Sequence, residues 1–210
     1  MAEAVKYADG YLREHLSPGG GVLDIGANGG MLAAEYARAV GPDGYVLAVE
    51  PDPTSFAALQ HGLRDLPHAH PVQAAVGAVR GETVIYPDGL QTSRWKSLTS
   101  KPGPAVTVPM TTLDQLAPLV PNLLGIKIDV QGGEYDVLEG AAETLTRAHV
   151  VWQIELWPKG LDAAGTSAGA VCDRLEAAGL VPLSRSWAQV REQCGRLNGS
   201  YLDVVCRHAG

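Results

Sequence analysis

Two acidic side chains frame a glycine-rich turn near the start of the chain. Asp24 precedes the turn, residues 26–30 (GANGG), and Glu50 follows twenty residues after Gly30 at the end of an apolar run. Glycines allow a backbone to approach a ligand closely, and a carboxylate on the neighbouring strand can accept hydrogen bonds from ribose hydroxyls. The spacing therefore predicts a site for a cofactor that contains adenosine.

The composition of the turn indicates which cofactor this is. A nicotinamide dinucleotide site usually has glycine at three positions of G-x-G-x-x-G, but here Asn28 and Met31 occupy the second and third positions. Asn28 can adopt the left-handed conformation that a glycine would otherwise supply. Asp24 would repel a pyrophosphate, whereas it would attract the cationic amine of a methionine moiety. We therefore expect S-adenosylmethionine as the cofactor and S-adenosylhomocysteine as its product.

Two further carboxylates, Asp129 and Glu155, are candidates for acid–base chemistry on an acceptor. Asp129 ends a predicted strand at the carboxyl edge, where open α/β sheets bind ligands, so we expect it to remove a proton from an acceptor hydroxyl. The alternative is that Asp129 caps a helix that begins near Gly133. Glu155 lies near the end of the next apolar run. We expect it either to contact the acceptor, as a base or as a binding group, or to form an ion pair at the end of the strand.

An alternation of strands and helices is needed to position these residues. Apolar runs separated by glycine and proline breaks predict parallel strands, and each pair of parallel strands needs a long crossover connection. Residues 1–20 are expected to form a lead-in helix and a flexible break. Core strands are expected at residues 22–25, 45–49, 72–76, 124–129 and 150–156, with helices that begin near residues 31, 53, 112, 134 and 168.

Two parts of the chain depart from this alternation. Residues 83–86 and 106–110 are expected to be strands of an excursion around a polar loop, residues 88–103, which we expect to contact the acceptor. Residues 180–184 and 201–205 are expected to pair as antiparallel neighbours, because no helix fits comfortably between them. No repeat or linker interrupts the pattern, so we expect one α/β domain over residues 1–210.

Composition narrows the class of partner. The chain has 210 residues, of which 46% are hydrophobic and 19% are charged, as in a soluble domain with an ample core. A net charge of -7 argues against a nucleic-acid partner, and no apolar run suits a membrane span or a secretory signal. The three cysteines share no metal-type spacing, so we expect reduced thiols in the cytoplasm. The expected partner is a small-molecule acceptor.

Five blocks of sequence occur in a recognisable order between residues 20 and 157. They are the turn with its preceding strand at residues 22–30, then 49–53 (VEPDP), 111–114 (TTLD), 126–134 (IKIDVQGGE) and 154–155 (IE). In this order they resemble the FkbM-like family of class I S-adenosylmethionine-dependent methyltransferases. The resemblance implies a Rossmann-like, doubly wound seven-stranded sheet with an antiparallel C-terminal hairpin. It also implies O-methylation of natural products, sugars or glycans, although some relatives methylate nitrogen.

Two positions depart from the family pattern. Gln131 stands where the family commonly has glutamate, which removes one charge and argues against a metal ion or a base there. Because His68 and His70 also lack a third ligand nearby, we expect no metal ion. Many class I methyltransferases contact adenine through an acid after the third strand, whereas this chain has Gln73 and Ala75 there, so we expect adenine to be bound by Gln73 or by backbone groups.

The expected contacts divide into a cofactor set and an acceptor set. Acceptor contacts are expected from Gln131, from Trp157, and from Trp95 and Lys96 in the basic segment 94–101. The alternative is that this segment is a solvated loop and that Trp157 belongs to the core. The N-terminal helix or the second subunit of a homodimer could complete the acceptor site. The expected cofactor contacts are Asp24, Gly26, Ala27, Asn28, Gly30, Glu50, Pro51, Gln73, Ala75 and Asp129.

The favoured function is O-methylation of a small molecule by in-line transfer, in which the protein mainly aligns acceptor, methyl group and sulfur. Three alternatives stay open. An N-methyltransferase would use the same cofactor but would need an unprotonated acceptor nitrogen. A nicotinamide-dependent oxidoreductase is disfavoured by Asp24 and by the altered glycines, and a non-catalytic module that only binds S-adenosylmethionine is left open by Gln131.

Overall fold

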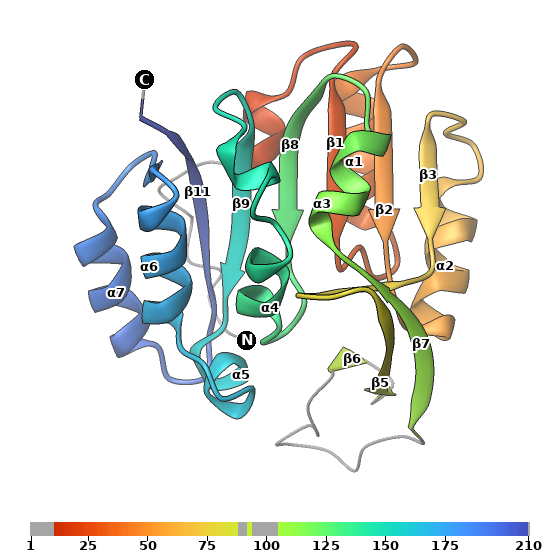
Figure 1. Ribbon diagram of the computed structural model, residues 1–210. Helices are drawn as coiled ribbons and strands as arrows, with labels where there is room; N and C mark the ends of the chain where they lie inside the picture. The colour runs from red at the N-terminus through yellow and green to blue at the C-terminus, as the bar shows by residue number, and fades with distance from the viewer. Residues whose placement is uncertain (1–10, 88–91, 94–104, 210) are drawn as a thin grey trace.

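A seven-stranded sheet forms the centre of the molecule (Figure 1). The computed structural model describes residues 11–87, 92–93 and 105–209. The strands of this sheet are β1 (Gly21–Ile25), β2 (Tyr45–Val49), β3 (Ala69–Val72), β8 (Leu123–Ile128), β9 (Val151–Leu156), β10 (Leu180–Pro182) and β11 (Leu202–His208). Their order is β10-β11-β9-β8-β1-β2-β3, and only β11 runs antiparallel to its neighbours. The predicted α/β sheet with an antiparallel C-terminal hairpin is confirmed.

Helices cover both faces of this sheet (Figure 1). One face carries the 3-10 helix η1 (Leu12–His15), α1 (Met31–Val40) and α2 (Pro53–Leu63). The other face carries α3 (Leu113–Leu116), α4 (Glu134–Glu139), α6 (Ala168–Ala177) and α7 (Trp187–Arg196). The short elements α5 (Pro158–Ala163), η2 (Ala117–Leu119) and η3 (Thr144–Thr146) complete the connections. Each face therefore has its own hydrophobic core, which is the doubly wound arrangement.

Local chemistry explains how the first two helices begin. Asp52 caps α2 because its side chain accepts a hydrogen bond from the Ser55 backbone N–H at 2.7 Å, and Pro53 occupies the first helical position. Gly30 precedes α1 with a φ of 84°. A Cβ atom at Gly30 would lie 2.7 Å from Leu59 Cδ1, so the glycine lets α1 and α2 pack closely.

A smaller sheet lies beyond the carboxyl ends of the main strands (Figure 1). Its strands are β4 (Ala75–Val76), β5 (Gly81–Pro87), β6 (Thr92–Ser93) and β7 (Val106–Thr111), in the order β4-β7-β5-β6. The predicted excursion is thus confirmed at β5 and β7. The strand predicted at residues 72–76 is in fact two strands, because Val72 pairs with Val49 in the main sheet whereas Ala75 pairs with Met110 in the smaller one.

The prediction that no helix separates the last two strands is wrong. Helix α7 lies between β10 and β11, although the two strands do pair antiparallel as expected. The helix buries only Trp187, Val190 and Cys194, so its apolar stripe is thin. A signal was present in the sequence, since Ser186 and Gln189 form a reciprocal capping box at its start. Helix α5 was also missed.

Two predicted segments can be only partly compared with the structure. Of the lead-in helix expected in residues 1–20, the described part is η1, and residues 1–10 lie outside the described residues. Most of the polar loop 88–103 also lies outside them. Every helix in the described part of the chain is too short or too polar to cross a bilayer.

Gly26 should be far less tolerant of a side chain than Gly41. Both have a positive φ, at 79° and 70°, but a Cβ at Gly26 would lie 1.8 Å from the Asp129 carbonyl oxygen, whereas nothing lies within 4 Å of a Cβ at Gly41. Gly41→Ala should cost about 1 kcal/mol from its backbone conformation. Gly26→Ala should lower the free energy of unfolding by about 3 kcal/mol, because the main chain must also move. Urea denaturation of both variants checks this, and equal losses would contradict it.

Candidate functional site

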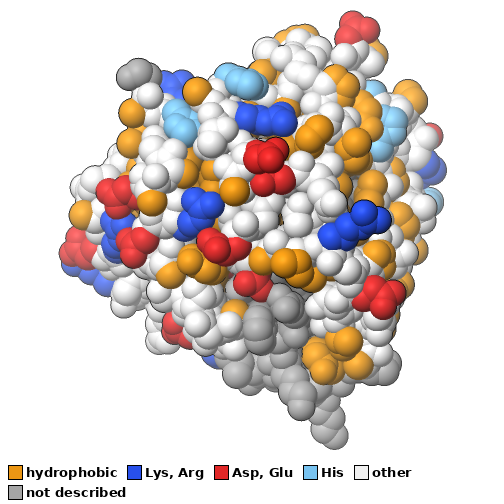
Figure 2. All heavy atoms as spheres, viewed as in Figure 1, with side chains coloured by type: hydrophobic (Ala, Val, Ile, Leu, Met, Phe, Trp, Pro, Cys, Tyr) orange, Lys and Arg blue, Asp and Glu red, His pale blue; other side chains and the backbone are white. Residues whose placement is uncertain are grey.

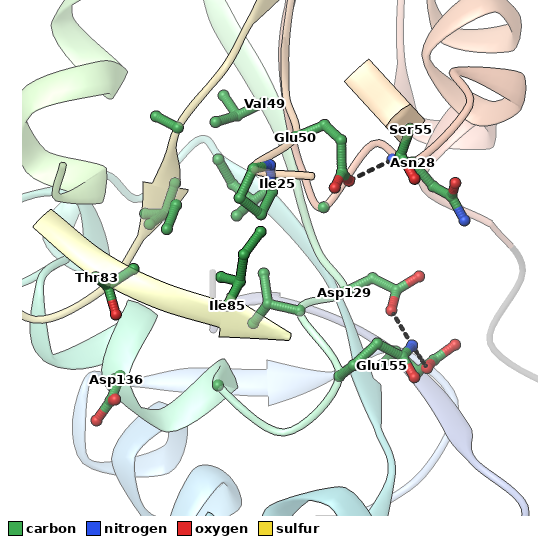
Figure 3. Close-up of a pocket in the computed structure, with 18 of the residues that line it drawn as sticks. Ile25, Asn28, Val49, Glu50, Ser55, Thr83, Ile85, Asp129, Asp136 and Glu155 are labelled. Carbon is green, nitrogen blue, oxygen red and sulfur yellow. Dashed lines mark hydrogen bonds between the residues drawn. The ribbon is translucent and has the colours of Figure 1, made fainter. Parts of the chain in front are cut away.

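A cavity of about 540 Å³ opens at the carboxyl ends of β1, β2 and β8, a volume that suits a cofactor (Figure 3). One part of its wall is polar and includes Asn28, Glu50, Asp129, Gln131 and Glu155. Another part is apolar and comes from Ala74, Val76, Ile85 and Met110, of which the last three belong to the smaller sheet. This contribution from the smaller sheet was not foreseen in the sequence.

The glycine turn forms one edge of the cavity. The Gly26 and Ala27 backbone N–H groups both donate to the Val49 carbonyl oxygen, at 2.9 and 3.0 Å, which ties the turn to the end of β2. Asn28 has a φ of 48°, so it takes the left-handed conformation that was predicted. The Asn28 backbone N–H donates to Glu50 Oε2 at 2.8 Å (Figure 3). The turn and the acid that frame the predicted cofactor site are therefore in direct contact.

The Glu50 carboxylate fits the ribose of an adenosine cofactor. Its second oxygen, Oε1, accepts from the Asp52 backbone N–H at 2.9 Å, and the side chain is only 4% exposed. Each oxygen thus has one hydrogen bond, although a carboxylate can accept about four. Burial raises the pKa of Glu50, while the two backbone N–H groups oppose that shift. Donors from ribose hydroxyls would fill the remaining sites and favour the charged form.

Several residues of the expected cofactor set lie on the cavity wall and others do not. Pro51 and Ala75 line the cavity together with Gly26, Asn28, Glu50 and Asp129. Ala27, Gly30 and Gln73 are outside the lining, so their expected contacts with the cofactor stay predictions. Gly30 also lets α1 and α2 pack closely, because a Cβ there would lie 2.7 Å from Leu59 Cδ1. The apolar wall is the part of the cavity that suits the adenine ring.

Asp24 does not line the cavity, and its expected contact with the cofactor amine stays a prediction. Its side chain is fully buried, and Oδ1 lies 3.7 Å from Lys127 Nζ on the neighbouring strand. The two residues are register partners in β1 and β8, so they share one face of the sheet. Burial raises the pKa of Asp24, and the Lys127 ammonium opposes that shift. Asp24 is therefore the partner of the buried Lys127 ammonium group inside the sheet.

A hydrogen-bonded cluster joins the ends of β8 and β9 at the cavity (Figure 3). Asp129 Oδ2 accepts from Lys127 Nζ at 3.1 Å, and Asp129 Oδ1 accepts from Gln131 Nε2 at 2.7 Å. Gln131 Nε2 also donates to Glu155 Oε1 at 2.9 Å. An amide can donate to both carboxyl groups, whereas an ionised glutamate at position 131 could not. The departure from the family pattern therefore has a structural role that the sequence did not reveal.

Glu155 is held in its neutral form by its surroundings. Burial, followed by the nearby Asp129 carboxylate, raises the pKa of Glu155 to about 9. At neutral pH this side chain is protonated, so it can donate a hydrogen bond but cannot take up a proton. The two candidate catalytic carboxyl groups thus differ in what they can do.

Glu134 stabilises the turn that carries this cluster. Its buried carboxyl group accepts from the Val130 N–H at 3.1 Å and from the Gly132 N–H at 3.0 and 3.1 Å. Gln131 and Gly132 have φ values of 55° and 109°, so the turn needs this support. Burial raises the pKa of Glu134 to about 7, against the pull of the backbone N–H groups. These contacts support the interpretation of Glu134 as a stabiliser of the helix start.

The expected acceptor residues are only partly placed. Gln131 and Trp157 line the cavity, whereas Trp95 and Lys96 lie outside the described residues. His68 Nε2 lies 2.9 Å from the Ala37 carbonyl oxygen, and the His70 ring stacks on Tyr45 at 4.3 Å. Within residues 11–87, 92–93 and 105–209, no group of three or more His, Cys, Asp or Glu is arranged to hold a metal ion.

Comparison with protein families matches residues 24–181 to the methyltransferase FkbM domain. Among solved structures, methyltransferase FkbM from Methylobacillus flagellatus KT is 17% identical, with a TM-score of 0.49 over 67% of this chain. The alignment covers 34% of that protein, so this chain spans about a third of its length. No curated protein sequence matches the chain.

Other solved structures are similar in fold. A putative rRNA-methylase from Clostridium thermocellum is 9% identical, with a TM-score of 0.61 over 99% of this chain and 98% of that one. Aeropyrum pernix fibrillarin, in complex with natively bound S-adenosyl-L-methionine, is 14% identical, with a TM-score of 0.51 over 90% of this chain and 67% of that one. At these identities the likeness establishes the methyltransferase fold.

The raised pKa of Glu155 should make the free energy of unfolding depend on pH. Between its ordinary value of 4.5 and about 9, the folded chain holds a proton that the unfolded chain has lost. The free energy of unfolding should therefore fall as pH rises through this window, by up to about 1.4 kcal/mol per pH unit for one proton. Glu155→Gln should reduce this slope, and Glu82→Gln on β5, where the side chain is exposed, should not. Urea denaturation from pH 5 to pH 8 checks it; an unchanged slope in Glu155→Gln would contradict the assignment.

Proposed function

The chain belongs to the FkbM family of methyltransferases, and from this premise we propose that it methylates a hydroxyl group of a small-molecule acceptor. The domain is a S-adenosylmethionine-dependent methyltransferase. One observation supports the choice of a hydroxyl: the Asp129 carboxylate lies on the cavity wall, held from two sides by Lys127 and Gln131. A hydroxyl has to lose its proton when it is methylated, and a positioned carboxylate can take that proton.

The residues that would hold the cofactor follow from the cavity. Glu50 would accept hydrogen bonds from the ribose, the backbone of the turn from Gly26 to Asn28 would lie against the cofactor, and the apolar wall would contact adenine. When bound, S-adenosylmethionine supplies an electrophilic methyl group attached to a sulfonium. The protein then contributes alignment, which can lower the barrier of such a reaction by about 7 to 11 kcal/mol.

Asp129 and Glu155 have separate roles in this proposal. Asp129 is the general base, because its carboxylate is available to accept the hydroxyl proton. Glu155 is a hydrogen-bonding neighbour, since the raised pKa keeps it protonated at neutral pH. Gln131 spans the two and fixes their separation. A base in this position contributes roughly 10²- to 10⁴-fold to the rate.

The charge of the chain supports a small acceptor over a nucleic acid. The net charge is -7, and a polyanion would be repelled by it. Figure 2 shows Lys and Arg side chains interspersed with Asp and Glu over the described part of the face in view. Nucleic-acid binding proteins usually gather their basic side chains on one surface.

Asp129→Asn should lower kcat for hydroxyl methylation by about 10²- to 10⁴-fold. The amide keeps the size of the side chain but cannot take up the proton. The affinity for S-adenosylhomocysteine, measured by calorimetry, should change by less than about tenfold, because Glu50 and the turn are untouched. Asp136→Asn is the control, since Asp136 also lies on the cavity wall but outside the cluster.

The assay uses S-adenosylmethionine with a labelled methyl group and a panel of hydroxyl and amide acceptors. Full activity of Asp129→Asn on hydroxyls would refute the role of the base. Methylation of amides alone by the unaltered protein would instead favour the N-methyltransferase alternative.

A further inference from the structure

Asp203 on β11 is a buried acid that lies outside the five blocks that resemble the FkbM-like family. It is 8% exposed, and its register partner on the antiparallel strand β9 is Glu155, which is 9% exposed. Residues directly opposite each other on antiparallel strands share one face of the sheet, with their Cβ atoms about 4.5 to 5.5 Å apart. The two carboxyl groups therefore lie next to each other in the interior of the protein.

An amide orients each member of this pair. Gln153 Nε2 donates to Asp203 Oδ1 at 3.0 Å, while Gln153 Oε1 accepts from the Leu12 backbone N–H at 2.9 Å. Gln131 Nε2 donates to Glu155 Oε1 at 2.9 Å. Both carboxyl groups thus have a fixed orientation, and neither amide carries a charge that would balance theirs.

No cation balances two negative charges at this position. The buried ammonium group of Lys127 forms its ion pairs with Asp24 and Asp129, at 3.7 and 3.1 Å. In the described part of the chain, no basic side chain forms an ion pair with Asp203 or Glu155. Two like charges that are buried close together oppose each other's ionisation, so this pair retains one proton at neutral pH.

Glu155 is the member of the pair that carries the proton. Burial, the Asp129 carboxylate and the Asp203 carboxylate, in that order, raise the pKa of Glu155 to about 9. Burial also raises the pKa of Asp203, but the Gln153 amide and the Lys127 ammonium group oppose that shift. The two acids of the pair therefore differ in charge at neutral pH.

Glu155 lies where two cavities meet. A second cavity, of about 400 Å³, lies between η1, α1 and the strands β8, β9 and β11. Asp129, Glu155 and Tyr201 line both this cavity and the cofactor cavity. Asp203 lines only the second cavity, so its effect on the cofactor side has to pass through Glu155.

Charged groups reach the surroundings of Glu155 from every element that packs around it. They are Lys127 and Asp129 from the end of β8, Asp203 from β11, Glu134 from α4, and Arg13 and Glu35 from η1 and α1 across the second cavity. Arg13 and Glu35 pair with each other at 3.2 Å. Since Asp129 is the proposed base, Asp203 is the acid that sets the charge of Glu155 without taking part in the proton transfer.

We propose that Asp203 is a positioning residue for methyl transfer: the pair that it forms with Glu155 holds one proton, which keeps Glu155 as a hydrogen-bond donor beside the base. The Gln131 amide donates to Glu155 Oε1, so Oε2 carries the proton and can donate to an oxygen atom of the acceptor. An ionised Glu155 would lose this contact and would compete with Asp129 for the hydroxyl proton. The inference rests on the proposed hydroxyl methylation and adds a residue that acts from outside the cofactor cavity.

The test measures the ionisation of Glu155 separately from activity. The isotope-labelled side-chain carboxyl carbon of Glu155 is followed by NMR from pH 5 to pH 10 in the full chain, and its signal is assigned with Glu155→Gln. Asp203→Asn removes the charge at nearly constant size, whereas Asp203→Glu keeps the charge and changes the length. Asp203→Ser repeats the neutralisation if the asparagine variant does not fold. Asp173→Asn is the matched control, because Asp173 is exposed on α6.

Glu155 should titrate at about pH 9 in the unaltered protein, in Asp203→Glu and in Asp173→Asn. In Asp203→Asn the midpoint should fall by about one pH unit, because a neighbouring negative charge is gone. The alkaline limb of kcat for hydroxyl methylation, measured with the acceptor of the panel that reacts fastest, should move to lower pH by the same amount.

An unchanged midpoint in Asp203→Asn, or an unchanged kcat profile despite a shifted midpoint, would overturn the inference. So would a midpoint near the ordinary value of 4.5 in the unaltered protein. Equal shifts in Asp203→Asn and Asp203→Glu would also overturn it, because they would assign the effect to packing. Methylation of amides alone would refute the proposed function, and the NMR midpoints would still support or refute the shared proton.

Discussion

A positive charge buried inside the sheet is the constraint around which the site is built. Lys127 lies in the middle of the structure on β8 and is only 4% exposed, so its ammonium group requires acidic partners. Burial alone would lower the pKa of Lys127, but the carboxylates of Asp24 and Asp129 raise it above its usual range. Asp24 is the partner inside the sheet, and Asp129 is the partner that reaches the cavity. The need to balance one buried charge thus sets the position of the proposed base.

The other parts of the site extend from this pair. Gln131 connects Asp129 to Glu155, and Glu134 holds the turn on which Gln131 stands. On the opposite side of the turn at Gly26, the Glu50 carboxylate is fixed by backbone N–H groups, so it is oriented before a cofactor arrives. Buried ion pairs such as Lys127 with Asp24 and Asp129 contribute little net stability to a fold. Clusters of ionisable groups with shifted pKa values are common at functional sites, so we relate this cluster to function.

The sequence was sufficient to predict those features of the fold and the site that depend on residues close together in the chain. The glycine turn, the left-handed Asn28 and the parallel strands could be predicted because each depends on neighbouring residues. The location of Asp24 could not, since it depends on the register between β1 and β8, which places Lys127 opposite it. From the sequence, Gln131 could be interpreted only as the replacement of a charged glutamate. Its role depends on hydrogen bonds to the carboxyl groups of Asp129 and Glu155, which only the structure shows.

The most direct test of this account removes the buried charge together with its internal partner. Lys127→Met alone should lower the free energy of unfolding by about 3 to 5 kcal/mol, because Asp24 is left buried without a cation. The double variant Asp24→Leu/Lys127→Met should recover most of that loss, yet its kcat should remain at least about tenfold below that of the unaltered protein, because Asp129 has lost the group that positions it. A double variant that regains both stability and full methyl transfer would contradict the claim that the buried charge positions the base.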